Sequence, residues 1–524
     1  MNAKRRTTQG LLVLLLAIAS CACTVSGGEA PSLVPVDVAQ FIVPAGSSVT
    51  LGFQADAAAC QASIAYVVQD YVGAEESSGS AKCRADNTVE LLVKLPRGYH
   101  EIRFTALNAA FGVIALHQLN ERVSAFFGID TAFSYLELSA DKRAQFVGQL
   151  SRLGIMSVRD RISWNELQPD QQSWNGAGHH QFDDLRQLYS QHGIKVLDVL
   201  QGLPGDSADY FPSSKASVSM ISEMAGRWGK VWNGVEIANE PDHNRVYDKL
   251  SPAEQSQYQR QYASYASLAS KEIKDVVPAA RVVGGAFAFA LSGDKLDSSK
   301  FADGIAAAGL TQSVDAISFH TYVEPKTLRR DIGTYRDWLL RSGVPDMPLW
   351  ITEAGWPWKR GPGRPPLDQD QASALQMAGK AVVAYAMGIE RYYPFVYPYY
   401  EEKEKNFGMT GKERTPLRSL AAYAQAAKAL SGSSAISSLG NLSEDGVGAL
   451  FKTPNGAVLV IHQKESSGSR PWLSVPFPVA KCEGIDGRDL KMVDGRVPLT
   501  DGLVYVWISD ADIAKAKDML ERVR

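Results

Sequence analysis

The sequence predicts an α/β protein: a (β/α)8 barrel, or TIM barrel, flanked by an N-terminal and a C-terminal small β domain. Between residues 121 and 431, short apolar runs alternate eight times with helical segments. The runs are almost continuously apolar, as expected for parallel strands buried on both faces. The segments before and after show period-two alternation, which is typical of antiparallel sheets. A barrel of roughly 310 residues lies within the usual size range.

The first 23 residues predict an export signal. Lys4-Arg5-Arg6 precedes an apolar run from 11 to 18, which is too short to span a bilayer comfortably. Ile18-Ala19-Ser20-Cys21 resembles a bacterial lipoprotein processing box, with Cys21 as the lipidated residue. An ordinary cleaved signal is the alternative. We expect export to the bacterial periplasm or outer membrane, with membrane contact through the lipid anchor only.

Composition and cysteine usage exclude some classes of partner. The 524 residues are 45% hydrophobic and 21% charged, with a formal net charge of −3. This balance lacks the basic stripe of a nucleic-acid-binding protein. Cys60 and Cys83 are expected to form a disulfide in an exported protein, which leaves Cys482 as a buried thiol. No CxxC motif or Cys/His cluster suggests a metal, so we expect no cofactor.

The flanking segments are each predicted as one β domain. Residues 24–32 form a tether, and the N-terminal domain, 24–120, contains expected strands at 48–53, 89–93 and 100–105. The C-terminal domain, 432–524, contains expected strands at 448–451, 457–461 and 503–508, followed by an amphipathic helix over 510–523.

Eight strand–helix units fill the barrel segment. The first helix is predicted to begin after the N-cap Ser139 and to end at Gly154. Strands are expected at 126–129, 156–159, 195–199, 235–238, 282–284, 316–319, 349–352 and 392–397. Helices are expected at 139–153, 182–192, 215–228, 254–276, 300–308, 328–340, 371–387 and 415–430.

Two of these strands lead directly to a glutamate. Glu240 follows the fourth strand before Pro241, and Glu353 ends the seventh strand. Residues at the carboxyl ends of barrel strands converge on one site. Two carboxylates facing one substrate are what glycoside hydrolysis needs, because one protonates the leaving oxygen while the other attacks the sugar or activates water. Mutual repulsion and burial should raise one of the two pKa values.

Asn239-Glu240-Pro241 and Thr352-Glu353 together resemble glycoside hydrolase clan A, whose members are retaining enzymes on a TIM barrel. The tripeptide and the appended β domain are most similar to family 39 and related bacterial exopolysaccharide glycosidases. The resemblance implies that Glu240 is the acid/base, that Asn239 holds the 2-hydroxyl of the sugar, and that Glu353 is the nucleophile.

Further polar residues lie at strand ends. Arg159 ends the second strand and is expected to orient a carboxylate, although the assignment can shift to Arg161. His320 and Tyr322 end the sixth strand and are expected to contact the substrate or the two glutamates. The clan commonly has an arginine and such a pair at these places. A structural salt bridge and loop packing are the alternatives.

Aromatic residues near strand ends are candidates for sugar stacking. Trp356, Trp358 and Trp164 are the tryptophans of this kind, and Trp356 is our choice for substrate binding. Clan members usually have a tryptophan at the end of the eighth strand. This sequence has none there, and Tyr397 or Phe395 is expected to replace it.

These observations predict an exported retaining glycoside hydrolase that cleaves β-glycosidic bonds in a polysaccharide or oligosaccharide. The alternative is a non-catalytic polysaccharide-binding lipoprotein. Glu324 is the second choice for a catalytic carboxylate. Glu236 is expected to face away from the barrel neighbours of Glu240 or to begin its strand, and Glu401 and Glu402 to form a solvated face.

Overall fold

The computed structural model describes most of the chain after the predicted signal. The described residues are 32–61, 63–168, 174–201, 210–211, 215–244, 246–291, 298–359, 363–436, 440–443, 446–463, 472–499 and 502–522. The predicted signal segment and its lipidation residue, Cys21, lie outside them. Within these ranges, none of the helices combines the length and apolar character needed to cross a membrane.

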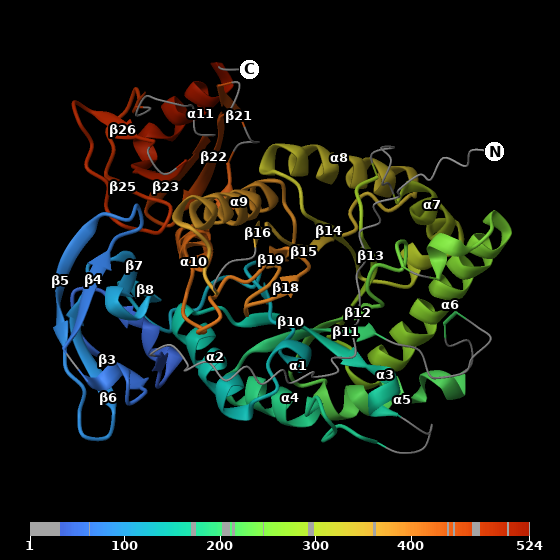
Figure 1. Ribbon diagram of the computed structural model, residues 1–524. Coiled ribbons are helices and arrows are strands. Elements are labelled where there is room, and N and C mark those ends of the chain that lie inside the picture. Colours follow the sequence, from blue (N-terminus) through green and yellow to red (C-terminus); the bar gives the residue numbers. More distant parts are fainter. Residues whose placement is uncertain are drawn as a thin grey trace, which may run out of the picture.

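The central element is an eight-stranded parallel sheet whose strands follow one another in chain order (Figure 1). A parallel bridge between Phe127 and Tyr392 joins the first and last strands, so the sheet closes into a barrel. The predicted (β/α)8 fold is therefore confirmed. The strands are β9 (Ile129–Asp130), β10 (Ser157–Ser163), β11 (Lys195–Gln201), β12 (Trp232–Ile237), β13 (Arg281–Phe287), β14 (Ala316–Thr321), β15 (Leu349–Ala354) and β17 (Arg391–Pro394).

A ring of helices surrounds the barrel (Figure 1). The Ser139 side chain accepts from the Lys142 N–H at the start of the first long helix, and Gly154, with φ of 79°, ends it as predicted. Two short helices, α1 (Phe133–Leu136) and α3 (Trp164–Leu167), were not predicted. The outer helices are α2 (Ala140–Leu153), α4 (Phe182–Gln191), α5 (Lys215–Trp228), α6 (Pro252–Val276), α7 (Ser299–Ala307), α8 (Pro325–Arg341), α9 (Leu367–Ala386) and α10 (Arg418–Leu430).

The N-terminal segment forms two sheets around a separate apolar core that contains Phe53 and Phe104. Most pairings are antiparallel as expected, but β2 runs parallel to β8. A disulfide joins Cys60 and Cys83. The strands are β1 (Leu33–Pro35), β2 (Ile42–Pro44), β3 (Ser48–Ala55), β4 (Ile64–Gln69), β5 (Glu75–Ala81), β6 (Thr88–Lys94), β7 (Gly98–Phe104) and β8 (Ala109–Leu116).

The C-terminal segment folds as a sheet packed against a terminal helix, α11 (Ile513–Arg522), whose Ala516 and Leu520 enter its core. Cys482 is buried and lies outside the Cys60–Cys83 disulfide, as predicted. The strands are β20 (Ser434–Ala435), β21 (Gly440–Ser443), β22 (Gly446–Thr453), β23 (Gly456–Gln463), β25 (Lys481–Glu483) and β27 (Leu503–Ile508), with a separate pair of β24 (Trp472–Ser474) and β26 (Arg496–Pro498).

Both β regions meet the same side of the barrel (Figure 1). Arg97, before β7, forms an ion pair with the buried Glu483 of β25 and donates to Gln425 Oε1 of α10 over 2.8 Å. Gln425 in turn donates to Glu483 Oε2 over 3.0 Å. Three regions of the chain are thereby joined through one buried polar cluster.

Candidate active site

Glu240 lies just beyond β12, in a turn with unusual backbone geometry. Ala238 and Glu240 have φ values of 66° and 48°, in the left-handed region that non-glycine residues seldom adopt. The Glu240 N–H donates to Ala286 O over 3.1 Å, which ties the turn to the end of β13. Such strain persists where the surrounding structure enforces it, and it is often found at functional sites.

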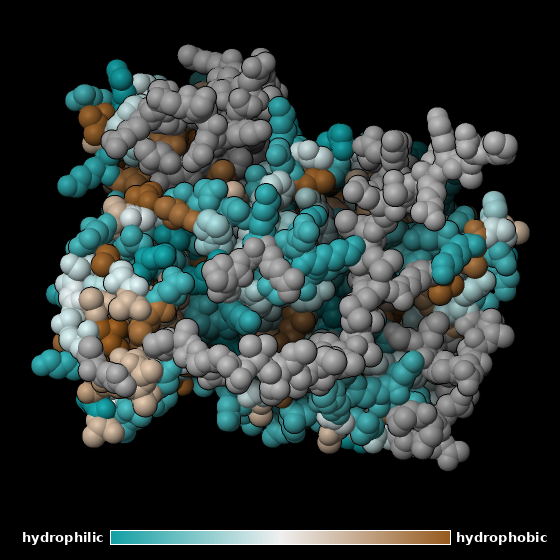
Figure 2. Space-filling model, viewed as in Figure 1, coloured by the Kyte–Doolittle hydropathy of each residue, from teal (hydrophilic) through white to brown (hydrophobic). Residues whose placement is uncertain are grey.

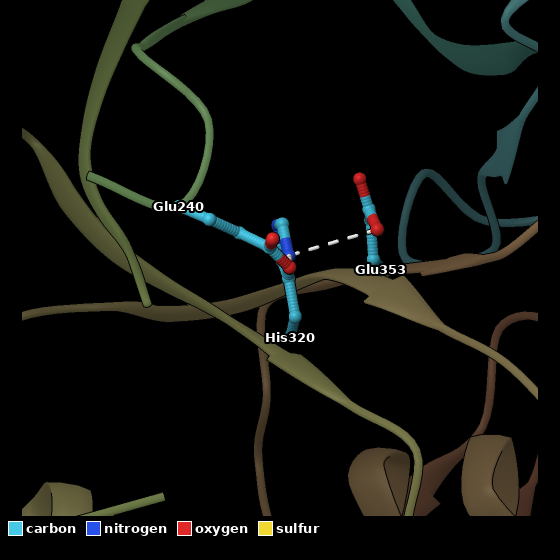
Figure 3. A group of neighbouring side chains, drawn as sticks. All are labelled: Glu240, His320 and Glu353. Atoms are coloured by element: carbon cyan, nitrogen blue, oxygen red, sulfur yellow. Dashed lines mark hydrogen bonds and ion pairs between the residues drawn. The ribbon is translucent and has the colours of Figure 1, made fainter. Parts of the chain in front are cut away.

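Glu240 approaches Glu353 of β15 and His320 of β14 (Figure 3). One carboxylate oxygen from each glutamate and one ring nitrogen of His320 all lie within 4.8 Å of one another. The His320 Nδ1 atom is 2.8 Å from Glu240 Oε1 and 3.6 Å from Glu353 Oε2. The structure therefore brings the two predicted glutamates together around the predicted histidine.

The Glu353 carboxylate is surrounded by donors. Its Oε1 accepts from Arg159 Nη1 over 2.5 Å and from Arg161 Nη2 over 2.7 Å, and its Oε2 accepts from the Tyr322 hydroxyl over 2.8 Å. Burial alone would raise its pKa, but the positive charges of His320, Arg159 and Arg161 outweigh burial and lower the pKa well below the usual range. Glu353 is accordingly held as an anion.

Arg159 is fully buried and donates hydrogen bonds both to residues predicted for the site and to residues that were not. Its Nε donates to Glu236 Oε2 over 2.8 Å, its Nη1 to Asp130 Oδ2 over 2.7 Å, and its Nη2 to Asn239 Oδ1 over 2.8 Å. Glu236 also accepts from Ser318 Oγ over 2.6 Å. The expectation that Glu236 faces away from the barrel neighbours of Glu240 is wrong, because its carboxylate lies inside the barrel on Arg159.

Arg161 shares two of the partners of Arg159, Asp130 and Glu353, so both arginines lie in this site. Arg161 donates to Asp130 through Nη1 over 2.6 Å and through Nη2 over 2.9 Å. Sequence reasoning missed Asp130, although its position at the end of the first strand was an available signal. The two guanidinium groups are neutralised by buried carboxylates, as buried charges require.

His320 and Tyr322 both contact the glutamates. Burial alone would lower the pKa of His320, but the charge of Glu353 and the hydrogen bond to Glu240 outweigh burial and raise the pKa. Desolvation and the charges of Glu353 and Glu240 raise the pKa of Tyr322 well above its usual value. Tyr322 therefore remains protonated and donates to Glu353.

The aromatic predictions are only partly matched by the structure. Trp356 is half-buried beyond the end of β15, whereas Trp164 and Trp358 are almost fully buried and belong to the interior. Tyr397 is fully buried, its ring packs against Phe146 of α2, and its hydroxyl donates to another α2 side chain. The prediction that Tyr397 binds substrate is therefore wrong, because its side chain is buried between the end of strand eight and α2.

Phe395, the other candidate, lies next to the site. The Arg161 guanidinium carbon lies 5.7 Å from its ring centre, and its ring packs against Tyr322 at 6.3 Å and Phe407 at 5.7 Å. Phe395 thus occupies the place that was expected for the strand-eight aromatic residue.

A small antiparallel sheet lies over the barrel mouth, formed by β16 (Trp358–Lys359), β18 (Glu401–Glu402) and β19 (Lys405–Asn406) (Figure 1). Glu402 is half-buried. Burial raises its pKa, and the negative charges of Glu240 and Glu353 contribute to the shift. The expectation of a solvated face was therefore wrong for Glu402, which lies near the catalytic candidates. From the same viewpoint, hydrophilic residues gather around a hollow over the centre of the barrel (Figure 2).

The three central side chains also contain the donor types of a metal site, with two carboxylates and one imidazole. The His320 Nδ1 atom already contacts Glu240 Oε1 over 2.8 Å.

The fold is a (β/α)8 barrel, and Glu240 and Glu353, carried by strands four and seven, meet at its carboxyl end. No protein-family model matches the sequence, and no curated protein matches it. Solved structures do match. A family 39 glycoside hydrolase from the gut symbiont Bacteroides cellulosilyticus WH2 is 14% identical, with a TM-score of 0.69 over 91% of this chain and 100% of that chain. A GH39 β-xylosidase from Caulobacter crescentus is 16% identical, with a TM-score of 0.50 over 75% of this chain and 99% of that one.

Proposed function

We propose that the protein is a retaining glycoside hydrolase that cleaves β-glycosidic bonds in a polysaccharide or oligosaccharide. The observation that carries this proposal is the approach of Glu240 and Glu353, whose oxygens lie within 4.8 Å of each other and of His320. Retaining enzymes place their carboxyl groups about 5–5.5 Å apart, and inverting enzymes about 6.5–9.5 Å apart. The structural neighbours from family 39 support the same class.

In the first step, Glu353 attacks the anomeric carbon and the bond to the leaving oxygen breaks. Glu240 donates its proton to that oxygen, so the leaving group departs as an alcohol. The product is a covalent glycosyl ester on Glu353. The low pKa of Glu353, set by His320 and the two arginines, suits a nucleophile that must be ionised before attack.

In the second step, Glu240, now a carboxylate, removes a proton from a water molecule. The water oxygen bonds to the anomeric carbon and the ester bond to Glu353 breaks. Glu240 regains its proton and Glu353 its negative charge, which restores the free enzyme. Two displacements on opposite faces leave the anomeric configuration unchanged.

Two further residues are proposed to bind the sugar. Asn239 accepts from Arg159 through Oδ1, which leaves its amide N–H groups oriented for the 2-hydroxyl. Trp356, which is half-buried just after strand seven, provides an aromatic face for a sugar ring.

We further propose that the enzyme is exported and anchored by a lipid on Cys21. The basic and apolar N-terminal residues support export, and the Cys60–Cys83 disulfide fits an oxidising compartment. An envelope location would give the site access to bacterial exopolysaccharides. The β domains at 24–120 and 432–524 are proposed to support the barrel, as the Arg97–Glu483 ion pair suggests.

The test is reducing-end release from a panel of bacterial and plant polysaccharides that includes the organism's own exopolysaccharide. Wild type is compared with Glu353→Gln and Glu240→Gln. Glu324→Gln is the matched control and also tests the second-choice carboxylate, because Glu324 is an exposed glutamate beyond strand six. We expect release by wild type and by the control, and loss of about 1,000-fold or more in the two site variants. Proton NMR of the first product should show retained anomeric configuration.

Equal release by wild type and Glu353→Gln would remove Glu353 as nucleophile. Inversion of the anomeric centre would replace double displacement by direct attack of water. Absence of release, with binding of the same polysaccharides by wild type and both variants, would favour the non-catalytic binding protein.

A further inference from the structure

Lys380, on α9, is a buried lysine that the mechanism does not use. Its side chain is fully buried, and burial lowers its pKa to about 7. Lysine is almost never fully buried without an opposite charge, because removing an ammonium group from water is costly. Here Nζ donates to the backbone carbonyl of Gly355 over 2.6 Å. This position suggests that the ammonium group has a specific local task.

Gly355 is two residues beyond Glu353, where β15 ends. Its N–H donates to Thr321 O over 3.1 Å, so it connects the ends of β14 and β15. The side of Gly355 that would carry a Cβ faces Tyr322, because a Cβ there would lie only 2.5 Å from Tyr322 Cε1. The Gly355 backbone is therefore the surface on which the Tyr322 ring rests.

Tyr322 completes a continuous series of contacts. Lys380 holds the Gly355 carbonyl, Gly355 supports the Tyr322 ring, and Tyr322 donates to Glu353 Oε2 over 2.8 Å. The ammonium group also lies 5.6 Å from the ring centre of Trp356, the next residue in the same turn. The buried Lys380 side chain thus contacts the turn that leads from the proposed nucleophile to the proposed sugar platform.

We propose that Lys380 is a positioning residue, which fixes the turn after strand seven and thereby sets the hydrogen bond from Tyr322 to Glu353. This inference rests on the proposed glycosidase function for its effect on rate. Its structural consequence, the position of the Tyr322 hydroxyl, does not depend on activity. Lys380 itself contacts neither substrate nor reacting atoms.

The experiment is a double-mutant cycle with Lys380→Met and Tyr322→Phe, measured by kcat and KM on the polysaccharide that wild type cleaves. Met has a similar length but no N–H donor. Met377→Ala is the control, because Met377 is a buried residue of the same helix and has no part in these contacts. We expect Lys380→Met to lower kcat about 10-fold, with KM changed less than twofold and no such fall in Met377→Ala. In the Tyr322→Phe background, Lys380→Met should cause no further fall.

An equal fall caused by Lys380→Met in both backgrounds would overturn the proposal, as would a fall of the same size in Met377→Ala. Crystal structures of wild type and Lys380→Met without substrate supply a readout that needs no activity. The separation of Tyr322 Oη and Glu353 Oε2 should lengthen beyond hydrogen-bond distance in the variant, and an unchanged separation would refute the positioning role. Absence of sugar release by wild type would count against the proposed function alone. Lys380→Leu, which also lacks an N–H donor, serves the same comparisons if the Met variant is recovered unfolded.

Discussion

The Tyr322 hydroxyl donates to Glu353 Oε2 over 2.8 Å, and Tyr322 directly follows β14, the strand that pairs with the Glu353 strand β15. The other carboxylate oxygen of Glu353 accepts from two arginines. The side chain is thus fixed at both oxygens before any substrate binds. In the proposed mechanism, Glu353 held in this way would lose little orientational freedom on attack, which is one source of enzymatic rate enhancement.

Tyr322→Phe should lower kcat/KM by roughly 10- to 100-fold, because a hydrogen bond to a charged group contributes about 1.5–3 kcal/mol. The comparison is steady-state kinetics on the polysaccharide that wild type cleaves. Tyr385→Phe is the control, since the Tyr385 hydroxyl donates over 2.6 Å to the backbone carbonyl of Ser433 and lies outside the site. Equal rates for wild type and Tyr322→Phe would mean that the arginines alone orient Glu353.

Arg159→Met should reduce both stability and activity. The substitution would leave the buried carboxylates of Asp130, Glu236 and Glu353 with less positive charge. Breaking a buried ion pair from one side costs roughly 3–5 kcal/mol. Urea unfolding at pH 7 measures this loss. Arg281→Met, which removes a partly exposed pair with Glu390, should cost no more than about 1 kcal/mol.

A small effect of Arg159→Met on unfolding, comparable with that of Arg281→Met, would show that Arg161 compensates within the cluster. Arg161 contacts two of the same carboxylates, Asp130 and Glu353. The double variant would then separate the contributions of the two guanidinium groups.

The barrel and the central pair were predictable from sequence because strand ends converge in this fold. Apolar runs that end in Glu240 and Glu353 carry enough information to place both carboxylates at one edge. The turn geometry was not predictable, since Ala238 and Glu240 adopt left-handed φ values without a glycine to signal it. Glu236 was misplaced because a carboxylate inside a strand normally implies an exposed face, and here Arg159 neutralises it within the barrel.

The alternation of side chains along a strand could not show which aromatic residue after strand eight faces the site. Phe395 and Tyr397 are two residues apart and would face the same side of a continuing strand. The strand ends at Pro394, so this rule no longer applies, and the two rings point to different places. Lys380 gave no sequence signal either, because a single lysine in an alanine-rich helix is usually exposed.

Gly355→Ala should impair catalysis more than stability. The added methyl group would press on the Tyr322 ring and displace its hydroxyl from Glu353, so we expect kcat to fall by about 10-fold or more. Kinetics and thermal unfolding are measured together. Gly333→Ala is the control, because it lies in α8 with open space around its Cβ, and it should stabilise the protein by about 0.5–1 kcal/mol. Unchanged kcat in Gly355→Ala would show that Tyr322 tolerates the methyl group without losing its partner.

Asp242, in the loop that carries Glu240, should make stability depend on pH in a defined window. Burial raises its pKa from 3.8 to about 6, although hydrogen bonds from Ser298 and the Ala288 N–H partly oppose the shift. The folded state therefore binds more protons than the unfolded state between these two values. Stability contributed by the protonated carboxyl is present below pH 3.8 and is lost as the pH rises through about 6.

Asp242→Asn removes this titration while keeping a side chain of the same shape. Between pH 3.8 and about 6, the free energy of unfolding of Asp242→Asn should rise relative to that of wild type by up to about 3 kcal/mol. Above that range the difference between the two proteins should stay constant. Urea unfolding of both proteins from pH 3.5 to 7.5 measures the difference, in which the shared titrations of other buried carboxylates cancel. Parallel stability curves would mean that Asp242 ionises as easily in the folded protein as in the unfolded chain. Burial of the Asp242 charge would then cost the folded protein nothing. Backbone hydrogen bonds alone would account for the conformation of the loop that carries the proposed acid/base.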